Sequence, residues 1–411
     1  MRPWTHYRLS WRALEVQVLY DVPRTPHKPA WGAWGGRRWA LRKGRCGHSV
    51  PATAPGLAAG RRYVFNRAPL LVYWEVTRAC DLACQHCRAE ATPDRHPLEL
   101  SSEEGFRMLR DATRFGPPLP HWVLTGGDPF KRSDLPALVQ EARALGFGVS
   151  LAPSATPLVT TAALRDVARA GVQAVSLSLD GATADLHDAV RGIPGCFQLT
   201  LQLARRVREE GIALQINTLV TARTAEDLPA LYELVRKLDV VRWSLFFLIR
   251  VGRGRLLEEV SPQAAERLCH WLFDLSQQSP FAIKTTEAPH FRRVALLRML
   301  REGMSLPEVA RTSVGRGFGV RDGNGIVFVS HVGEVYPSGF LPLPVGSVRE
   351  RSLVDLYQSS ELLVQLRDTS QLREKCGRCP FREVCGGSRA RAYAHTGSPL
   401  ASDPLCPYEP A

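Results

Sequence analysis

Residues 80–87 read Cys80-Asp81-Leu82-Ala83-Cys84-Gln85-His86-Cys87, so three cysteines are spaced C-x3-C-x2-C within one short segment. A closed four-iron cluster takes four thiolate ligands, and this segment supplies three. One iron would stay open to a ligand from outside the protein, much as a catalytic zinc site keeps an open position. The spacing therefore predicts a four-iron cluster with one open coordination position.

The alternative interpretation of this triplet is a zinc loop or a buried group of thiols. Zinc sites usually take a fourth protein ligand and favour paired C-x2-C units. His86 lies inside the segment, between two of the cysteines, and is poorly placed to be that ligand. The triplet alone favours the iron cluster and leaves zinc open.

Composition places the chain among ordinary globular proteins. Of its 411 residues 45% are hydrophobic and 23% are charged. Neither a membrane span nor a signal peptide is indicated. The ten cysteines fall largely into tight groups, which favours metal binding in a reducing compartment over disulfides. We expect a cytoplasmic protein.

The net charge of +13 comes mainly from the first 62 residues. This segment holds 12 of the 53 basic residues and two of the 40 acidic ones. It lacks a regular hydrophobic period and is rich in Trp, Arg, Gly and Pro, so we interpret it as a disordered leader. A basic arm that binds nucleic acid is the alternative, although the rest of the chain is nearly neutral and nucleic acid is not the expected partner.

From residue 70 onward, short apolar segments alternate with helical patterns. The pattern predicts strands at 70–77, 121–125, 147–151, 172–179, 212–220 and 241–249, with helices between them and a further helix at 261–277. Six β-then-α units without hairpin signals indicate a parallel sheet with helical crossovers. The cysteine segment follows the first strand, so it should lie at the carboxyl end of the sheet, where ligands gather in such folds.

The cysteine spacing and the motifs after the later strands together resemble the radical S-adenosylmethionine (SAM) superfamily. The resemblance implies an α/β fold, an incomplete (β/α)6 barrel; an open doubly wound sheet is the alternative. It also implies that SAM chelates the open iron and is cleaved by one electron to a 5′-deoxyadenosyl radical, which takes a hydrogen atom from the substrate.

The same resemblance assigns a SAM pocket to residues that follow four different strands. Gly126-Gly127-Asp128-Pro129 is similar to the family's Gly-Gly-Glu-Pro motif, which binds the SAM amino group, and a plain Gly-Gly turn is the alternative. Ser178 and Asp180 would lie near the ribose. Arg191 would hold the SAM carboxylate, because its fork can bind a carboxylate with two hydrogen bonds. Asn217 resembles another pocket position or satisfies backbone groups, and His86 would lie near the adenine.

A second cysteine group lies near the end of the chain: Cys376, Cys379 and Cys385, spaced C-x2-C-x5-C, and then Cys406. It resembles the auxiliary-cluster region of SPASM and twitch proteins, which is small and C-terminal. Ser338 stands where a full SPASM domain has a hairpin cysteine, and Arg389 stands where it has a cysteine after the third one of the C-terminal group. The first hairpin cysteine is also missing, because no cysteine occurs between Cys269 and Cys376. These absences imply one auxiliary [4Fe–4S] cluster; zinc is the alternative.

We divide the chain into the leader at 1–62, the partial barrel at 70–277, a linker region at 278–321 and the auxiliary-cluster domain at 322–411. That last domain should open with a hairpin at 326–336. The general acid or base is not identified. Lys284, Glu287, His290, His331 and Tyr336 carry titratable groups that could face the cavity.

The C-terminal motifs resemble the haem and haem d1 biosynthesis branch, whose members oxidise or remove propionate side chains of tetrapyrroles. Arg389 and Arg391 could pair with the carboxylates of such a substrate, or could bind backbone carbonyls instead. Modification of a peptide is the alternative reaction, and a non-catalytic iron–sulfur electron carrier or redox sensor is the alternative class. A low-potential donor such as flavodoxin or ferredoxin is the expected partner.

Overall fold

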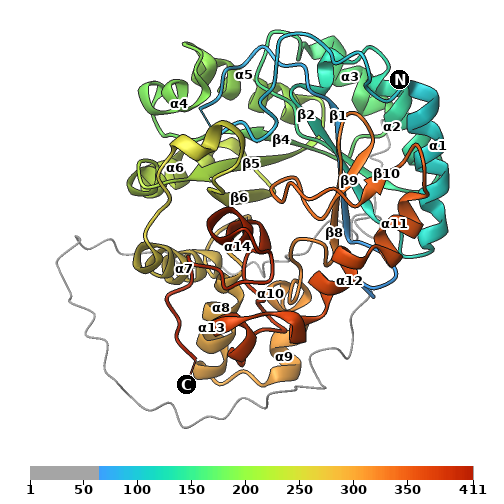
Figure 1. Ribbon diagram of the computed structural model, residues 1–411. Coiled ribbons are helices and arrows are strands. Elements are labelled where there is room, and N and C mark those ends of the chain that lie inside the picture. Colours follow the sequence, from blue (N-terminus) through green and yellow to red (C-terminus); the bar gives the residue numbers. More distant parts are fainter. Residues whose placement is uncertain (1–63, 411) are drawn as a thin grey trace, which may run out of the picture.

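The computed structural model describes residues 64–410 (Figure 1). The predicted basic leader at 1–62 lies outside the described residues. A single ten-stranded sheet, in the order β10-β9-β8-β1-β2-β3-β4-β5-β6-β7, organises the rest. Its strands are β1 Leu71–Thr77, β2 His121–Gly126, β3 Gly148–Leu151, β4 Ala174–Ser178, β5 Ala213–Val220, β6 Arg242–Phe247, β7 Ala282–Thr286, β8 Ile326–Val329, β9 Glu334–Tyr336 and β10 Gly346–Ser347.

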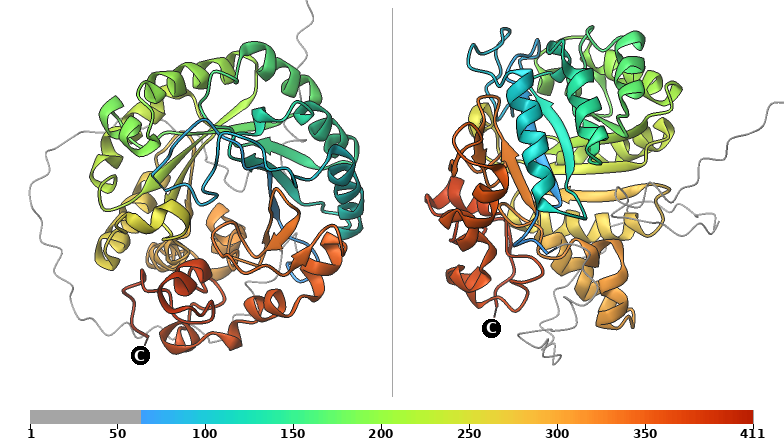
Figure 2. Two further views of the ribbon diagram at one scale, coloured as in Figure 1. Left: turned by 45° about the horizontal axis from the view of Figure 1, so that its top comes forward. Right: turned by 90° about the vertical axis from the view of Figure 1, so that its right-hand side faces the viewer.

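Helices connect and cover these strands, and Figure 2 shows them as a ring around the curved sheet. They are α1 Ser102–Ala112, α2 Leu135–Ala144, α3 Thr161–Ala170, α4 Ala184–Arg191, α5 Cys196–Glu209, α6 Leu228–Val235, α7 Pro262–Ser276, α8 His290–Arg301, α9 Leu306–Arg311, α10 Ser313–Arg316, α11 Leu353–Ser359, α12 Glu361–Arg367, α13 Glu374–Arg378 and α14 Arg389–Thr396.

The six predicted β-then-α units are present, and β1 to β6 are all parallel. Local sequence signals place their helices. Ser101 and Glu104 form a capping box at the start of α1, and Gly171 ends α3 in the left-handed conformation at φ 103°. The outcome is the incomplete α/β barrel expected from the sequence.

The core lies between the sheet and the helices. Trp74 and Trp122, from neighbouring strands, are fully buried and meet edge to face at 6.2 Å. The interior of the barrel, by contrast, carries polar as well as apolar side chains, and Ser178 and Asn217 are among the polar ones. Because side chains alternate along a strand, one face of the sheet packs on the helices while the other is free to hold a ligand.

The segment at 278–321 differs from the expected linker. It contains β7, which pairs in parallel with β6 and extends the barrel, and then the three helices α8 to α10. The pattern is obscured because β7 is short and half polar, and because arginines interrupt the hydrophobic face of α8. Residues 278–321, predicted as a linker region, thus contain a barrel strand and three helices.

The hairpin predicted at 326–336 is present as β8 and β9, but it is not a separate element. β8 pairs in parallel with β1, so Leu71 lies opposite Ile326. The C-terminal part of the chain thereby joins the same sheet as the barrel.

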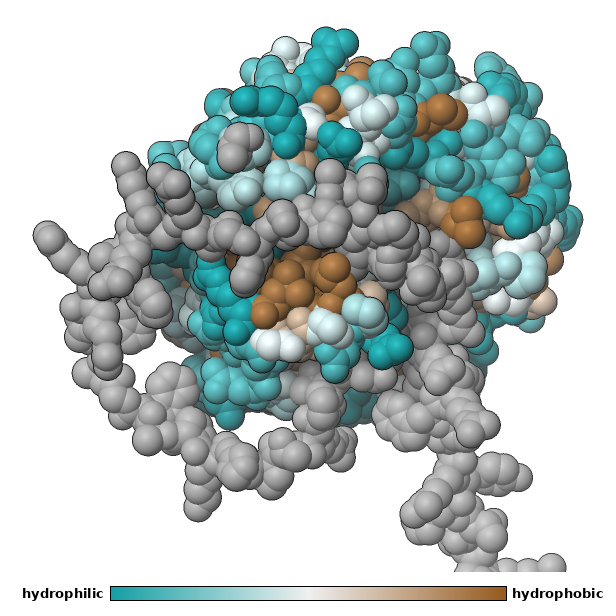
Figure 3. All heavy atoms as spheres, turned by 90° about the horizontal axis from the view of Figure 1, so that it is seen from below, coloured by the Kyte–Doolittle hydropathy of each residue, from teal (hydrophilic) through white to brown (hydrophobic). Residues whose placement is uncertain are grey.

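Seen from below, the described surface is mainly hydrophilic with a small hydrophobic group near its centre (Figure 3). Within the described part of the chain, no helix combines the length and the apolar character needed to cross a bilayer.

Candidate functional site

Two cavities are lined by the predicted cysteines, and the larger of these two, of about 220 Å³, opens at the carboxyl ends of the barrel strands. Ten of the predicted site residues line it, although they come from four different segments of the chain. They are Cys80, Cys84, His86, Cys87, Gly126, Gly127, Ser178, Asp180, Arg191 and Asn217.

The three clustered cysteines of this cavity are free thiols. The backbone N–H groups of Leu82 and Ala91 donate to the Cys80 and Cys87 sulfurs, each at 3.4 Å. On the opposite side of the loop, an Arg191 amino group lies 3.7 Å from the Cys84 sulfur. Donors around sulfur stabilise the thiolate form that binds iron. The residues therefore fit a cluster held by three cysteines.

Two residues that the sequence did not single out hold this loop. The Arg253 guanidinium donates to the Cys84 carbonyl at 2.9 Å, and its backbone N–H donates to the Cys87 carbonyl at 3.2 Å. From the loop after β3, the Ser154 hydroxyl lies 3.2 Å from the Cys80 sulfur and donates to the Gly127 carbonyl at 2.8 Å. Neither residue belongs to a motif, so only the fold shows their roles.

The glycine pair packs closely against the neighbouring backbone. A Cβ atom on Gly126 would lie 2.2 Å from the Thr77 carbonyl oxygen, and one on Gly127 would lie 2.2 Å from that of Ala79. Glycine is required because the loop after β2 lies directly against the loop that carries the cysteines. The two glycines thus hold the two loops together, and both also line the cavity, as predicted for a ligand pocket.

Asp128 does not line the cavity, in contrast to the other residues of the predicted pocket. Its carboxylate is fully buried and accepts hydrogen bonds from the Thr156 hydroxyl at 2.7 Å and from the Phe130 N–H at 3.2 Å. Burial raises its pKa. The side chain thus fixes the turn after the glycines.

A buried ion pair lies at the other side of the cavity. Arg191 and Asp180 approach to 2.5 Å, and Asp180 also accepts from the Leu219 N–H at 2.7 Å. Burial alone would raise the Asp180 pKa, but the charge of Arg191 and several smaller contributions, among them the Leu219 hydrogen bond, together outweigh it and the pKa is lowered. Burial and the same arginine lower the pKa of His86 to about 4, so the imidazole that lines the cavity is neutral near pH 7.

Asn217 takes part in a chain of side-chain hydrogen bonds along the inner face of the barrel. Its carbonyl oxygen accepts from the Gln215 amide at 2.7 Å, and Gln215 accepts from Arg242 at 3.1 Å. Its side chain therefore reaches a neighbouring side chain and the cavity, rather than the backbone groups that the alternative interpretation required.

A second, smaller cavity brings together the four C-terminal cysteines, which are also free thiols. Cys376, Cys379, Cys385 and Cys406 all line it. Arg293 lies 3.9 Å from the Cys406 sulfur, and Arg389 lies 3.8 Å from the Cys376 sulfur. Cationic donors next to several sulfurs suit a polynuclear cluster with net negative charge.

Arg389 and Arg391 do not reach a substrate site, because their side chains are 0–1% exposed. Arg389 donates to the Pro399 and Ala401 carbonyls. The interpretation that these arginines bind backbone carbonyls is therefore the one that the structure supports.

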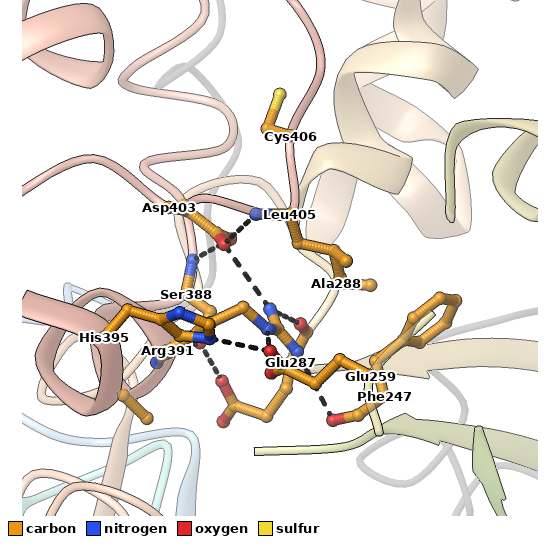
Figure 4. Close-up of polar contacts among 12 residues, drawn as sticks. Phe247, Glu259, Glu287, Ala288, Ser388, Arg391, His395, Asp403, Leu405 and Cys406 are labelled. Atoms are coloured by element: carbon orange, nitrogen blue, oxygen red, sulfur yellow. Dashed lines mark hydrogen bonds and ion pairs between the residues drawn. The ribbon is translucent and has the colours of Figure 1, made fainter. Parts of the chain in front are cut away.

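Arg391 connects the C-terminal region to the barrel (Figure 4). It pairs with Glu259 at 3.0 Å and lies 3.5 Å from Asp403. It also donates to the Glu287 carbonyl at 2.7 Å and to the Leu248 carbonyl, just past β6, at 2.9 Å. Its five donors thus join four segments.

The five titratable candidates are dispersed, and none lines the larger cavity. His331 contacts the buried carboxylate of Glu75 at 2.7 Å, and Tyr336 donates to Glu334.

His290 is fully buried, and burial lowers its pKa to about 4. Glu287 accepts from Ser388, and burial raises its pKa to about 8. Lys284 lies on the inner face of β7.

Comparisons with known proteins agree with this geometry. Residues 74–235 match the family model of the Radical SAM superfamily. The chain is 37% identical to the AdoMet-dependent heme synthase of Methanosarcina barkeri, over 84% of this chain and 98% of that protein. It is 30% identical to the pre-heme d1 synthase of Dinoroseobacter shibae, over 82% of this chain and 85% of that protein.

Among solved structures, the fold resembles Streptococcus suis SuiB bound to S-adenosylmethionine. The TM-score is 0.65 with 18% sequence identity, over 83% of this chain and 78% of that chain. This likeness concerns the fold alone.

The barrel, its three-cysteine loop and these relatives define a radical SAM enzyme, with the iron–sulfur cluster and the SAM requirement of that class. Within the superfamily the chain belongs to the haem-biosynthesis branch that contains the AdoMet-dependent heme synthases.

Proposed function

We propose that this enzyme oxidatively modifies a propionate side chain of an iron tetrapyrrole. The observation that carries the proposal is the relationship to the Methanosarcina barkeri heme synthase, which extends over 98% of that protein. The two cavities provide one site for radical formation and another for a closed iron–sulfur cluster.

The residues of the larger cavity take distinct roles in this proposal. Cys80, Cys84 and Cys87 would hold the cluster, and the bound cluster and SAM supply an organic radical. Arg191 would orient the SAM carboxylate while Asp180 fixes its guanidinium. His86, with its pKa lowered to about 4, would offer a neutral ring to the adenine.

We further propose one auxiliary [4Fe–4S] cluster on the four C-terminal cysteines, where it would supply an electron acceptor. Among residues 64–410, no group of three or more His, Cys, Asp or Glu side chains is arranged around a single metal ion. A zinc ion needs its thiolates about 2.3 Å from one point, whereas a four-iron cluster spreads them apart. This arrangement supports the cluster over zinc.

Three further assignments complete the proposal. The electron for SAM cleavage would come from a low-potential donor such as flavodoxin or ferredoxin. A reducing, cytoplasmic location suits nine described cysteines that are all free. We retain an auxiliary-cluster domain at 322–411, although its first strand is paired with the barrel.

Anaerobic reconstitution followed by assay tests this function. We expect about eight iron atoms per chain, dithionite-dependent 5′-deoxyadenosine, and loss of a carboxyl group from an iron tetrapyrrole detected by mass spectrometry. If wild type makes no more 5′-deoxyadenosine than the Cys84→Ala variant, radical catalysis is contradicted. If 5′-deoxyadenosine forms while every tetrapyrrole is recovered unchanged, the substrate assignment is contradicted.

A further inference from the structure

Apart from the neutral His86, the acidic and basic side chains of residues 64–410 that line the larger cavity are Arg88, Asp180 and Arg191. Asp180 and Arg191 pair with each other, and the proposed function gives Arg191 to the carboxylate of SAM. Arg88 comes from a different segment, directly after the three-cysteine loop, and has no role in that proposal. It is therefore the charged group of the cavity that is left for the substrate.

The neighbours of Arg88 hold its guanidinium in one position at the cavity wall. Its Nη1 group donates to the Glu75 carboxylate on β1 at 3.0 Å, and its Cζ atom lies 4.4 Å from the centre of the Phe328 ring on β8. A cation over an aromatic ring is attracted by the negative face of the ring. A Cβ atom on Gly339 would lie 3.0 Å from the Arg88 Nε, so a glycine at this position makes room for the guanidinium.

Glu75 is shared between two partners and occupies only part of the Arg88 guanidinium. The His331 ring nitrogen lies 2.7 Å from one carboxylate oxygen of Glu75, and Arg88 donates to the other. Burial alone would raise the Glu75 pKa, but Arg88, His331 and their hydrogen bonds together lower it, so the carboxylate is ionised at neutral pH. A guanidinium has several N–H donors, and the bond to Glu75 is the one hydrogen bond that Arg88 makes within the described part of the chain. Because the side chain is 20% exposed and lines the cavity, the other donors are open to a ligand.

The cavity wall beside Arg88 is apolar. Phe340, which follows Gly339, lines the cavity together with Ile249 from the segment after β6, and both belong to one hydrophobic cluster. An apolar wall with a single well-placed cation is typical of a site for a largely apolar ligand that carries an acidic group. A tetrapyrrole ring with propionate side chains has this chemistry, because its ring faces are apolar and its carboxylates are charged.

We propose that Arg88 binds a propionate carboxylate of the substrate at this wall of the larger cavity. This inference rests on the proposed function, because the tetrapyrrole of that proposal carries propionate groups. The planar guanidinium can donate two parallel hydrogen bonds to a carboxylate, and its contacts with Glu75 and Phe328 prevent it from turning away. Since Arg88 adjoins Cys87, a ring anchored there lies next to the site of radical formation.

Binding of iron coproporphyrin III and of its tetramethyl ester, which lacks free carboxylates, tests the inference. Both ligands are titrated into the reconstituted protein and followed by their absorbance. In wild type we expect the acid to bind more tightly than the ester. In Arg88→Met the affinity for the acid should fall by about tenfold to a hundredfold, the usual effect of losing a charged hydrogen bond, and the affinity for the ester should be unchanged. Arg88→Lys keeps the charge without the fork, so its preference for the acid should be reduced but not lost.

Arg95 offers a matched control, because it also pairs with a buried glutamate. It lies 2.7 Å from Glu99 and does not line the larger cavity. Arg95→Met should therefore bind both porphyrins like wild type. The iron content of each variant is measured in parallel, and we expect the wild-type content in all of them.

Equal affinity of wild type and Arg88→Met for the acid would overturn the inference and leave the proposed function standing. An equal loss of affinity for acid and ester would also overturn it, since Arg88 would then shape the cavity rather than bind a carboxylate. If Arg88→Met loses iron, Arg88→Lys decides, and an unchanged ratio of acid to ester affinity there overturns the inference. If wild type binds neither porphyrin, the proposed substrate itself is contradicted, and the role of Arg88 with it.

Discussion

Arg191 and Asp180 form a 2.5 Å ion pair in which the carboxylate is 1% exposed. The pair fixes the guanidinium at the cavity wall, beside Cys84. A fixed guanidinium can meet a second carboxylate with two parallel hydrogen bonds, whereas a lysine ammonium acts as a point charge.

Arg191→Lys should therefore weaken SAM binding by about tenfold while keeping a counter-ion for Asp180. Equilibrium binding of SAM to the reconstituted protein measures this effect. Arg255→Lys, a change at an exposed position, is the matched control and should bind SAM like wild type. An unchanged dissociation constant in Arg191→Lys would show that the carboxylate of SAM lies elsewhere.

Removal of one C-terminal thiolate should abolish the proposed auxiliary cluster and leave the cluster on the three-cysteine loop in place. In Cys385→Ala we expect the iron content to fall from about eight to about four atoms per chain. Formation of 5′-deoxyadenosine without substrate should persist, because the three-cysteine loop is intact. Cys269→Ala, which removes a buried thiol outside both cavities, should keep all the iron. A single zinc ion in Cys269→Ala and none in Cys385→Ala would contradict the auxiliary cluster.

Arg391→Met should destabilise the whole protein. The change leaves Glu259 and Asp403 without their shared cation and frees the Leu248 and Glu287 carbonyls. Breaking a buried pair of this kind costs about 3–5 kcal/mol of unfolding free energy. Anaerobic thermal unfolding should show a clearly lower midpoint than in wild type or in the surface variant Arg255→Met. A midpoint equal to wild type would mean that the segments are joined by other contacts.

Lys284 should make stability depend on pH. Its pKa is about 7 in the fold and 10.5 as the reference value, so the unfolded chain binds more protons between these limits. Stability then rises with pH across that window, and the full penalty applies below about pH 7. Lys284→Met should therefore raise the unfolding midpoint more at pH 6.5 than at pH 9. A gain that is larger at pH 9 would contradict the lowered pKa, and Lys237→Met, a change at an exposed position, should show no gain at either pH.

Much of the lining of the larger cavity could be predicted from sequence because it lies at or near strand ends. In a parallel sheet these ends share one edge, so Cys80, Gly126, Ser178 and Asn217 meet once their strands are recognised. The cysteines that surround the second cavity were predictable for a different reason, since their spacing is itself the signal.

Contacts between distant segments could not be predicted in this way. The sequence left open whether Arg391 pairs with substrate carboxylates or binds backbone carbonyls, and only the packing of α14 against the end of β6 shows that it is buried on carbonyls. Arg253 similarly reaches the Cys84 carbonyl from a loop far along the chain. Lys284 was missed as part of the barrel because β7 is too short and too polar to give a strand pattern.

The parallel pairing of Leu71 with Ile326 has a consequence for how the protein is made. β1, the first strand of residues 64–410, must wait for β8, one of the last strands of that range, before its second edge is covered. Until then that edge exposes unpaired backbone groups, and such long-range pairings are slow to form. The loop with Cys80 therefore emerges early, while the sheet beside it is still incomplete. Iron that binds during translation would bind to a chain whose later strand β8 has not yet been synthesised.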